Sequence, residues 1–241
     1  MWVLVVMYVL LIPCMVLFIH TKHKMGSTAP LAVALKAASI IIIVLAAIVG
    51  VTGIRESMHI FAIFVAGGLV LGLVGDVVIC QTEPGGFLSG MIYFALGHLC
   101  YIGAFLRIST HAIWAVPVFL VIYGIFLTVV IRLAKKFANM LVPTAIYGAT
   151  IATMVSLSTT VPFSVPRGYI LLAAAMLFMV SDGLLAYNTF VSAQDTNENS
   201  FLRHCYTAFH QMGDTRRLID WISLCCYFAA QSLFAVSIFC L

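Results

Sequence analysis

Two aspartates lie inside stretches of the chain that are otherwise apolar enough to cross a lipid bilayer. Asp182 lies in the apolar run from Gly168 to Val191, and Asp76 lies about one turn before the end of another such run. A carboxylate at the centre of a membrane helix costs about 2.5–3.5 kcal/mol on insertion scales, so an acid at such a position indicates a functional site. Two carboxyl groups in a water-poor pocket are typical of proton chemistry, because one can stay protonated while a nearby cation keeps the other ionised.

The composition places the chain in a membrane. Of its 241 residues, 63% are hydrophobic and only 8% are charged, whereas soluble domains carry about 25% charged residues. The net charge of +4 is small, and the basic residues form no patch interleaved with aromatic residues, so no nucleic-acid partner is expected. We therefore predict an integral, multi-pass membrane protein whose surroundings are the lipid bilayer.

Eight stretches of the chain have the length of a membrane-spanning helix, which is about 20 apolar residues. We therefore predict a single all-α domain, residues 1–241, with eight transmembrane helices. The predicted spans are roughly 1–19, 30–50, 58–80, 87–107, 112–132, 140–160, 168–191 and 218–241. All connecting loops are short except residues 192–217.

The basic residues of the loops predict the orientation of the chain. Those beside the ends of the first, third, fifth and seventh spans are Lys22, Lys24, Arg132, Lys135, Lys136, Arg203, Arg216 and Arg217, and those on the opposite side are Arg55, Arg107 and Arg167. Cytoplasmic loops carry the excess of Lys and Arg, so the first set is predicted to face the cytoplasm. Both termini are then on the non-cytoplasmic side.

The long loop 192–217 has two interpretations that fit equally well. Apolar residues recur at helical spacing over residues 200–212, with polar residues between them, as in a short amphipathic helix on the membrane interface. The alternative is a solvated loop that carries a few hydrophobic residues.

The other polar residues inside the spans gather toward one leaflet. In the predicted orientation, Lys36 lies about two turns into the second span, and His98 and Tyr101 lie near mid-membrane on one face of the fourth. Tyr227 and Gln231 share a face of the last span, because they are four residues apart. With the two aspartates, these residues fall in the cytoplasmic half or at the midplane. We therefore predict one polar cavity that opens toward the cytoplasmic leaflet.

Each of these residues also has a purely structural interpretation. Lys36 can extend its ammonium group to the interface, or pair with Asp76 only to stabilise the helices. His98 can donate to a backbone carbonyl, and the tyrosines and the glutamine can join helices. Asp220, near the start of the last span, is expected at the interface, where a carboxylate suits the helix dipole. Asp182 has the weakest structural interpretation, because no residue near it in the sequence can neutralise it.

Two common hydrolytic centres find no support. His98 is the one histidine predicted at mid-membrane, whereas a catalytic zinc ion needs three protein ligands. A serine nucleophile lacks a GxSxG motif, and Ser181 has no sequence partner that marks it as activated. We therefore expect no metal and no cofactor.

A series of short motifs carries a resemblance to a known family. The motifs are Lys36 in the second span, Gly75-Asp76 in the third, Phe87-x-x-Gly90-x-x-x-Phe94-x-x-Gly97-His98-x-x-Tyr101 in the fourth, Ser181-Asp182-x-x-x-Ala186-x-Asn188-x-Phe190 in the seventh and Tyr227-x-x-Ala230-Gln231 in the eighth. In this order they resemble the YhhN-type lysoplasmalogenase family over nearly the whole chain. The Gly-Asp, Gly-His-x-x-Tyr and Ser-Asp-x-x-x-Ala-x-Asn motifs are the most specific of them.

The resemblance implies an eight-helix membrane enzyme that hydrolyses the vinyl ether bond of lysoplasmalogens or related lysolipids. The products are a fatty aldehyde and a glycerophospho-headgroup, and the lysophospholipid substrate comes from the membrane. Asp182 is then expected to protonate the vinyl carbon, and Asp76 to stabilise the resulting cation and activate water, although the two roles can be exchanged. The expected substrate-binding residues are Lys36, His98, Tyr101, Ser181, Asn188, Tyr227 and Gln231. Lys36 is expected either to tune Asp76 or to contact the phosphate.

A function of another class uses the same residues. In a proton-coupled transporter, Asp76, Asp182 and Lys36 would form a proton relay and no bond would be cleaved. Release of a fatty aldehyde distinguishes the enzyme from the transporter.

Overall fold

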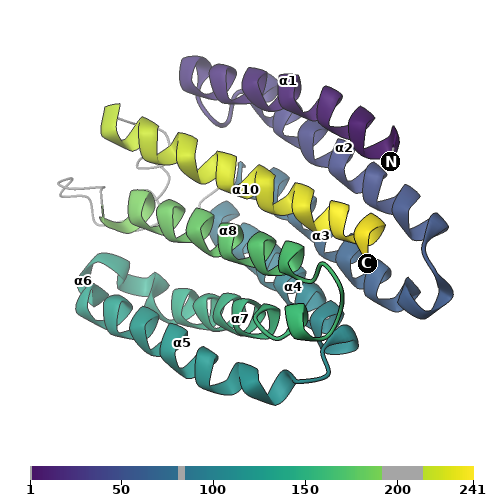
Figure 1. The fold of residues 1–241 in the computed structure, drawn as a ribbon. Coiled ribbons are helices and arrows are strands. Elements are labelled where there is room, and N and C mark those ends of the chain that lie inside the picture. Colours follow the sequence, from purple (N-terminus) through teal and green to yellow (C-terminus); the bar gives the residue numbers. More distant parts are fainter. Residues whose placement is uncertain (1, 81–84, 192–213) are drawn as a thin grey trace.

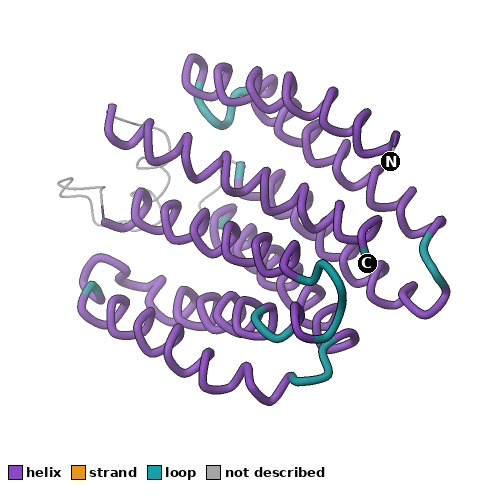
Figure 2. Tube along the Cα trace, in the orientation of Figure 1, coloured by secondary structure: helices purple, strands orange, loops and turns teal. Residues whose placement is uncertain are grey.

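The computed structural model describes residues 2–80, 85–191 and 214–241, and these ranges are helical apart from short connections (Figures 1 and 2). Eight helical segments in this part of the chain are long and apolar enough to cross a membrane, which confirms the predicted all-α, polytopic architecture. Their helices are α1 (Trp2–Met25), α2 (Pro30–Gly53), α3 (His59–Ile79), α4 (Gly86–Ile108), α5 (Ala115–Arg132), α7 (Leu141–Ser158), α8 (Tyr169–Ala186) and α10 (Asp214–Cys240).

Short helical turns complete the described elements. The 3₁₀ turns η1 (Glu56–Met58), η2 (Ala112–Trp114) and η4 (Val161–Phe163) lie between long helices, and α6 (Ala134–Phe137) with η3 (Ala138–Met140) joins α5 to α7. The π-helical turn η5 (Tyr187–Val191) continues α8 without a break.

The long helices form one bundle in which neighbours run roughly parallel or antiparallel to one another (Figure 1). The most extensive packing is between α3 and α4 and between α8 and α10, whereas α5 lies at an edge and packs mainly on α7. Both termini lie at one end of the bundle, and α6 lies at the opposite end (Figure 1). An even number of spans requires this arrangement. Which membrane side each end faces stays a prediction.

The outer surface of the bundle is apolar. Val9, Ile63, Leu120 and Ile146, on four different helices, are each at least 60% exposed. Soluble monomers rarely expose apolar patches larger than a few hundred Å², so this surface suits contact with lipid. The charged and polar side chains that do lie within the spans must therefore find partners inside the bundle.

Glycines bring α3 and α4 into backbone contact. A Cβ on Gly97 would lie 3.1 Å from the carbonyl oxygen of Gly68, and a Cβ on Gly90 would lie 3.3 Å from that of Gly75. Small residues at a helix interface allow this close approach. The pairing fixes α4, which carries His98 and Tyr101, directly beside α3, which carries Asp76.

Two helix boundaries differ from the predicted ones. The first helix continues to Met25 instead of ending near residue 19, so Lys22 lies inside α1 and not in a loop. Lys is a good helix former, and basic residues in a last turn suit the helix dipole, so the helix can continue through this polar segment. The last helix begins at Asp214, before residue 218. The predicted interfacial segment at 200–212 lies outside the described residues.

Candidate active site

A cavity of about 190 Å³ lies within the bundle, toward the end where α1, α3 and α8 finish and α2, α4 and α10 begin. Most of its wall is apolar, with Phe87, Met91, Phe126 and Ile151 among the lining residues. The polar residues that line it are Lys22, Ser27, Lys36, Asp76, Thr144, Tyr147, Ser181, Asp182, Asp220, Ser223 and Tyr227. A cavity of this size holds several water molecules. A cavity is therefore present where the polar residues were predicted to gather, and both aspartates line it, but its wall is mostly apolar.

Asp76 is a buried carboxylate with two strong donors. Its side chain is 2% exposed, and Lys36 of α2 places its ammonium nitrogen 2.6 Å from Oδ1. The Tyr227 hydroxyl of α10 donates to Oδ2 at 2.5 Å. An ammonium group at this distance stabilises the carboxylate form, so Asp76 has the partners of an ionised group. Of the alternatives left open for Lys36, the structure shows the ion pair with Asp76.

A chain of hydrogen bonds leads from α4 to Asp76. The Tyr101 hydroxyl donates to Gln231 Oε1 at 2.9 Å, and Gln231 Nε2 donates to the Tyr227 hydroxyl at 2.9 Å. Each donor in this chain points toward Asp76, so the dipoles add where the negative charge lies. Among the described residues, neither Tyr101 nor Gln231 lines the cavity. Both hold Tyr227 in place from the side that faces away from the cavity.

Two glycines of α3 make room for this chain. A Cβ on Gly68 would lie 2.5 Å from the Tyr101 ring, and a Cβ on Gly72 would lie 2.7 Å from Gln231 Nε2. Both distances are below any van der Waals contact, so a larger residue would displace the side chains. Gly68 and Gly72 therefore make room for the hydrogen-bonded side chains of the site as well as for the packing of helices.

Among the described residues, the neighbours of Asp182 are a phenol and an imidazole instead of an ammonium group. The Tyr147 hydroxyl of α7 donates a short hydrogen bond to Asp182 Oδ2. His98 Nε2 lies 3.7 Å from the same oxygen, which is longer than a direct hydrogen bond. The Asp182 side chain is 13% exposed, against 2% for Asp76. Asp182 is therefore the carboxyl group that is more open to the cavity.

His98 lies beside Asp182 and behind the cavity wall. Its ring packs edge-on against Phe178 at 4.6 Å between centroids and lies 5.6 Å from the Tyr147 ring. His98 Nε2 is buried without a hydrogen-bond partner among the described residues. At 3.7 Å, the His98 imidazole can reach Asp182 after a small movement of its side chain or through one bridging water molecule.

Ser181 and Asn188 take different positions on the same segment. Ser181 lines the cavity, and Ser223 of α10 donates to its carbonyl oxygen at 2.9 Å, which fastens α8 to α10. Asn188 is buried within η5 and is not among the described residues that line the cavity. π-Helical turns occur frequently at functional sites, and here the turn follows Asp182 by little more than one helical turn.

Three residues at the cavity were missed or misplaced by the sequence analysis. Tyr147 was not singled out, because a tyrosine in an apolar span gives no sign of a partner 35 residues away. Lys22 was predicted in a loop, and this prediction is wrong, because α1 continues to Met25. Asp220 was expected at the interface near the start of the last span, and its buried partner was not predicted. Lys22 and Asp220 are 7% and 3% exposed and form an ion pair at 2.6 Å, because the longer α1 brings Lys22 beside α10.

Two of the three carboxyl groups that line the cavity, those of Asp76 and Asp182, have unlike partners. Asp76 is held by an ammonium group and a phenol, whereas Asp182 contacts a phenol and has an imidazole nearby. An ammonium group beside a carboxyl group favours its ionised form, so the environments of Asp76 and Asp182 are set up differently. The pair can therefore supply an acid and a base at one place.

Comparison with known proteins places the chain in a family. The family model described as the YhhN family matches residues 31–238. The chain is 32% identical over 124 residues to a Homo sapiens protein named lysoplasmalogenase TMEM86B, and 32% identical over 127 residues to the Rattus norvegicus protein of that name. These alignments cover 52% of this chain and 50% and 49% of the two relatives, so the matched region spans about half of their length. No solved structure matches the chain. Because the family model covers most of its length, the chain belongs to the YhhN family.

Proposed function

We propose that the protein is a membrane hydrolase that cleaves the vinyl ether bond of lysoplasmalogens or related lysolipids. Membership of the YhhN family and the names of the two relatives support this reaction class. The observation that carries the proposal is that Asp76 and Asp182 line one cavity with different partners. Such a pair suits vinyl ether hydrolysis, because the reaction begins with the addition of a proton to carbon and continues with the attack of a water molecule.

In the first step, Asp182 protonates the vinyl carbon that is remote from the ether oxygen. The carbon–carbon double bond supplies the electron pair for the new C–H bond, and the other vinyl carbon becomes part of an oxocarbenium ion. Asp182 suits this role because it is more open than Asp76 and pairs with no ammonium group in the part of the chain that the structure describes. The Asp76 carboxylate stabilises the cation electrostatically across the cavity.

In the second step, Asp76 takes a proton from a water molecule that attacks the oxocarbenium carbon. The product is a hemiacetal. When it collapses, its hydroxyl proton returns to Asp182, Asp76 gives its proton to the departing glycerol oxygen, and the C–O bond breaks. One water molecule is consumed, a fatty aldehyde and a glycerophospho-headgroup are formed, and both carboxyl groups regain their first states.

The remaining predicted site residues take two kinds of role in this proposal. Lys36, Ser181 and Tyr227 contact the cavity and act on the substrate or on Asp76. His98, Tyr101, Asn188 and Gln231 act from behind the lining, where they position the groups that touch the substrate. The apolar lining near Phe87 and Phe126 accepts the start of the lipid tail. The rest of the tail stays in the bilayer.

The protein is an integral, multi-pass membrane protein, and its proposed orientation gives the substrate a direct route. If the end with the cavity faces the cytoplasm, a single-chain lipid reaches the cavity from the cytoplasmic leaflet. Both termini are then on the non-cytoplasmic side.

The test uses purified protein in detergent micelles with lysoplasmalogen as substrate and records aldehyde release. The matched control substrate is the lysolipid with a saturated ether in the same position, which has no vinyl carbon to protonate and must stay intact. We expect aldehyde from the vinyl ether lipid alone. If no aldehyde forms but proteoliposomes take up the lipid in response to a proton gradient, the protein is a proton-coupled transporter and the proposal fails.

A further inference from the structure

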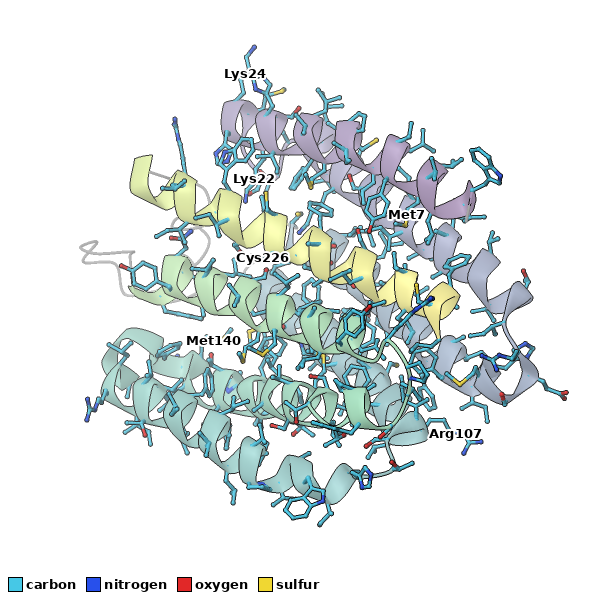
Figure 3. The ribbon with its side chains drawn as sticks, viewed as in Figure 1. Met7, Lys22, Lys24, Arg107, Met140 and Cys226 are labelled. Carbon is cyan, nitrogen blue, oxygen red and sulfur yellow. The ribbon has the colours of Figure 1, made fainter. Side chains whose placement is uncertain are left out.

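The cavity contains a second buried ion pair that the proposed chemistry does not use. The Lys22 ammonium nitrogen of α1 lies 2.6 Å from both carboxylate oxygens of Asp220 on α10. Both side chains line the cavity. Figure 3 shows Lys22 on the side of α1 that faces α10, whereas Lys24 points away from the bundle. A full positive and a full negative charge therefore face the same space as Asp76 and Asp182.

A buried ion pair adds little net stability to the contact between two helices. Removing two charges from water costs several kcal/mol per ion, and apolar side chains of similar volume are often equally or more stabilising. Most other contacts in this core are apolar. The position of the pair on the wall of the cavity indicates that its charges meet a ligand.

The distance from the pair to the reacting groups matches the length of a glycerophospholipid headgroup. Asp220, Ser223 and Tyr227 lie on one face of α10 and all line the cavity. Asp220 and Tyr227 are seven residues apart, a rise of about 10.5 Å, and Tyr227 holds Asp76. In the lipid, three carbons and one oxygen separate the ether oxygen from phosphorus, about 6 Å at bond lengths near 1.5 Å, and the ammonium group lies beyond. A lipid whose ether bond lies at Asp76 thus extends its headgroup charges toward Asp220.

We propose that Lys22 and Asp220 form the binding site for a zwitterionic phospho-ammonium headgroup. The lipid phosphate replaces Asp220 beside Lys22, and the lipid ammonium group replaces Lys22 beside Asp220. The exchange leaves every buried charge paired. The inference rests on the proposed function, since the lipid that carries the headgroup is its substrate.

The same geometry assigns the phosphate to Lys22 and not to Lys36. Lys36 is already 2.6 Å from Asp76, and its removal would leave the reacting carboxylate without its cation. Lys36 nevertheless lies close enough to Lys22 and Asp220 to interact with both electrostatically. The two described ion pairs contribute two positive and two negative groups, so a zwitterionic ligand can enter between them without changing their balance of charge.

The proposal predicts an order of affinities for three lipids that differ only in the headgroup. A phosphoethanolamine lipid exchanges with both charges. A lipid whose headgroup is a phosphate alone places extra negative charge beside Asp220. A lipid without phosphate, whose glycerol hydroxyl is free, gains neither ionic contact. Binding is measured with saturated ether lysolipids, which the hydrolase cannot cleave, on purified protein in nanodiscs. We expect the wild type to bind the phosphoethanolamine lipid at least about tenfold more tightly than the other two.

Three variants separate recognition from structure. Asp220→Asn removes the carboxylate that lies beside Lys22, so the preference between the phosphate and phosphoethanolamine lipids should shift by about tenfold or more toward phosphate. The double variant Lys22→Met/Asp220→Leu removes both members of the described ion pair together and should fold. It should bind the phosphoethanolamine lipid about 10–100-fold more weakly and the glycerol lipid as the wild type does. Lys24→Met removes an exposed charge two residues from Lys22 and should change neither affinity.

Equal losses of binding affinity for all three lipids in the double variant would overturn the proposal. An ion pair with only a structural role would change the affinity for every lipid by the same factor. An unchanged preference in Asp220→Asn would overturn it as well. Headgroup-selective binding without hydrolysis of the matching vinyl ether lipid would contradict the proposed function and leave the binding site supported. Hydrolysis without headgroup-selective binding would contradict the headgroup site and leave the proposed function supported.

Discussion

The two aspartates should differ sharply in what they contribute to stability, although both are proposed to be required for activity. Asp76→Asn leaves Lys36 buried at 9% exposure without its negative partner. Asp182→Asn leaves a tyrosine hydroxyl that can donate to the new amide oxygen equally well. The same chemical change therefore breaks an ion pair at one site and replaces one acceptor by another at the second.

The expected losses of stability in the two variants follow from the partners of each aspartate. Removing one member of a buried ion pair costs about 3–5 kcal/mol, whereas exchanging one hydrogen-bond acceptor for another costs about 1 kcal/mol or less. For a chain of this length, 1 kcal/mol shifts the midpoint of thermal unfolding by about 2–4 °C. We expect Asp76→Asn to lower Tm by about 6–20 °C, and Asp182→Asn to lower it by less than about 4 °C.

Thermal unfolding of the purified variants in one detergent, followed by circular dichroism at 222 nm, measures the difference. The double variant Asp76→Asn/Lys36→Met removes the unpaired charge, so it should recover most of the lost Tm and none of the activity. Equal Tm values for Asp76→Asn and Asp182→Asn would refute the reasoning. So would a double variant that is no more stable than Asp76→Asn.

Three further substitutions test the supporting contacts. Tyr147→Phe removes the hydrogen bond to Asp182, and the loss of about 1.5–3 kcal/mol should lower kcat for aldehyde release about 10–150-fold. Tyr227→Phe removes a donor to the Asp76 carboxylate and leaves Gln231 Nε2 unsatisfied, so the free energy of unfolding should fall by about 1–3 kcal/mol and kcat should fall as well. Gly72→Ala places a Cβ 2.7 Å from Gln231 Nε2, and this overpacking should destabilise the fold by about 1–3 kcal/mol in thermal unfolding.

Each of these substitutions has a matched control elsewhere in the chain. Tyr187→Phe changes a tyrosine that is 47% exposed and should leave kcat unaltered. Gly124→Ala adds a Cβ with no atom within 4 Å, so the higher helix propensity of Ala should stabilise the protein by about 0.5–1 kcal/mol. Full activity in Tyr147→Phe, or a Gly72→Ala variant as stable as Gly124→Ala, would contradict the roles assigned to these positions.

The helices and one half of the site could be predicted from the sequence. Apolar length alone identified the eight spans, because a bilayer imposes that length on every helix that crosses it. The pairing of Lys36 with Asp76 was one of the alternatives that the sequence offered, since few other charges lie inside the spans, and the structure selects it. The contact between Tyr227 and Gln231 followed from helical spacing.

The other half of the site depends on which helices are neighbours, and composition does not determine this. Tyr147 contacts Asp182 because α7 packs on α8. The available signal was that a tyrosine hydroxyl in the middle of a span needs a partner. Lys22 was assigned to a loop because apolar length ends the first helix near residue 19, whereas the helix continues until Met25. Its partner Asp220 lies 198 residues away, beyond the reach of local sequence patterns.

The central claim is that Asp182 protonates the vinyl carbon and that Asp76 is required to complete the hydrolysis. Hydrolysis of lysoplasmenylethanolamine in D₂O, with the aldehyde reduced to the alcohol as it forms, tests the claim most directly. The wild type should yield an alcohol chain with one deuterium from solvent on the carbon next to the former carbonyl. Asp182→Asn and Asp76→Asn should each release less than about 1% as much aldehyde, with Asp182→Asn folded as the wild type is. Aldehyde without that deuterium, or full activity in either variant, would contradict the account.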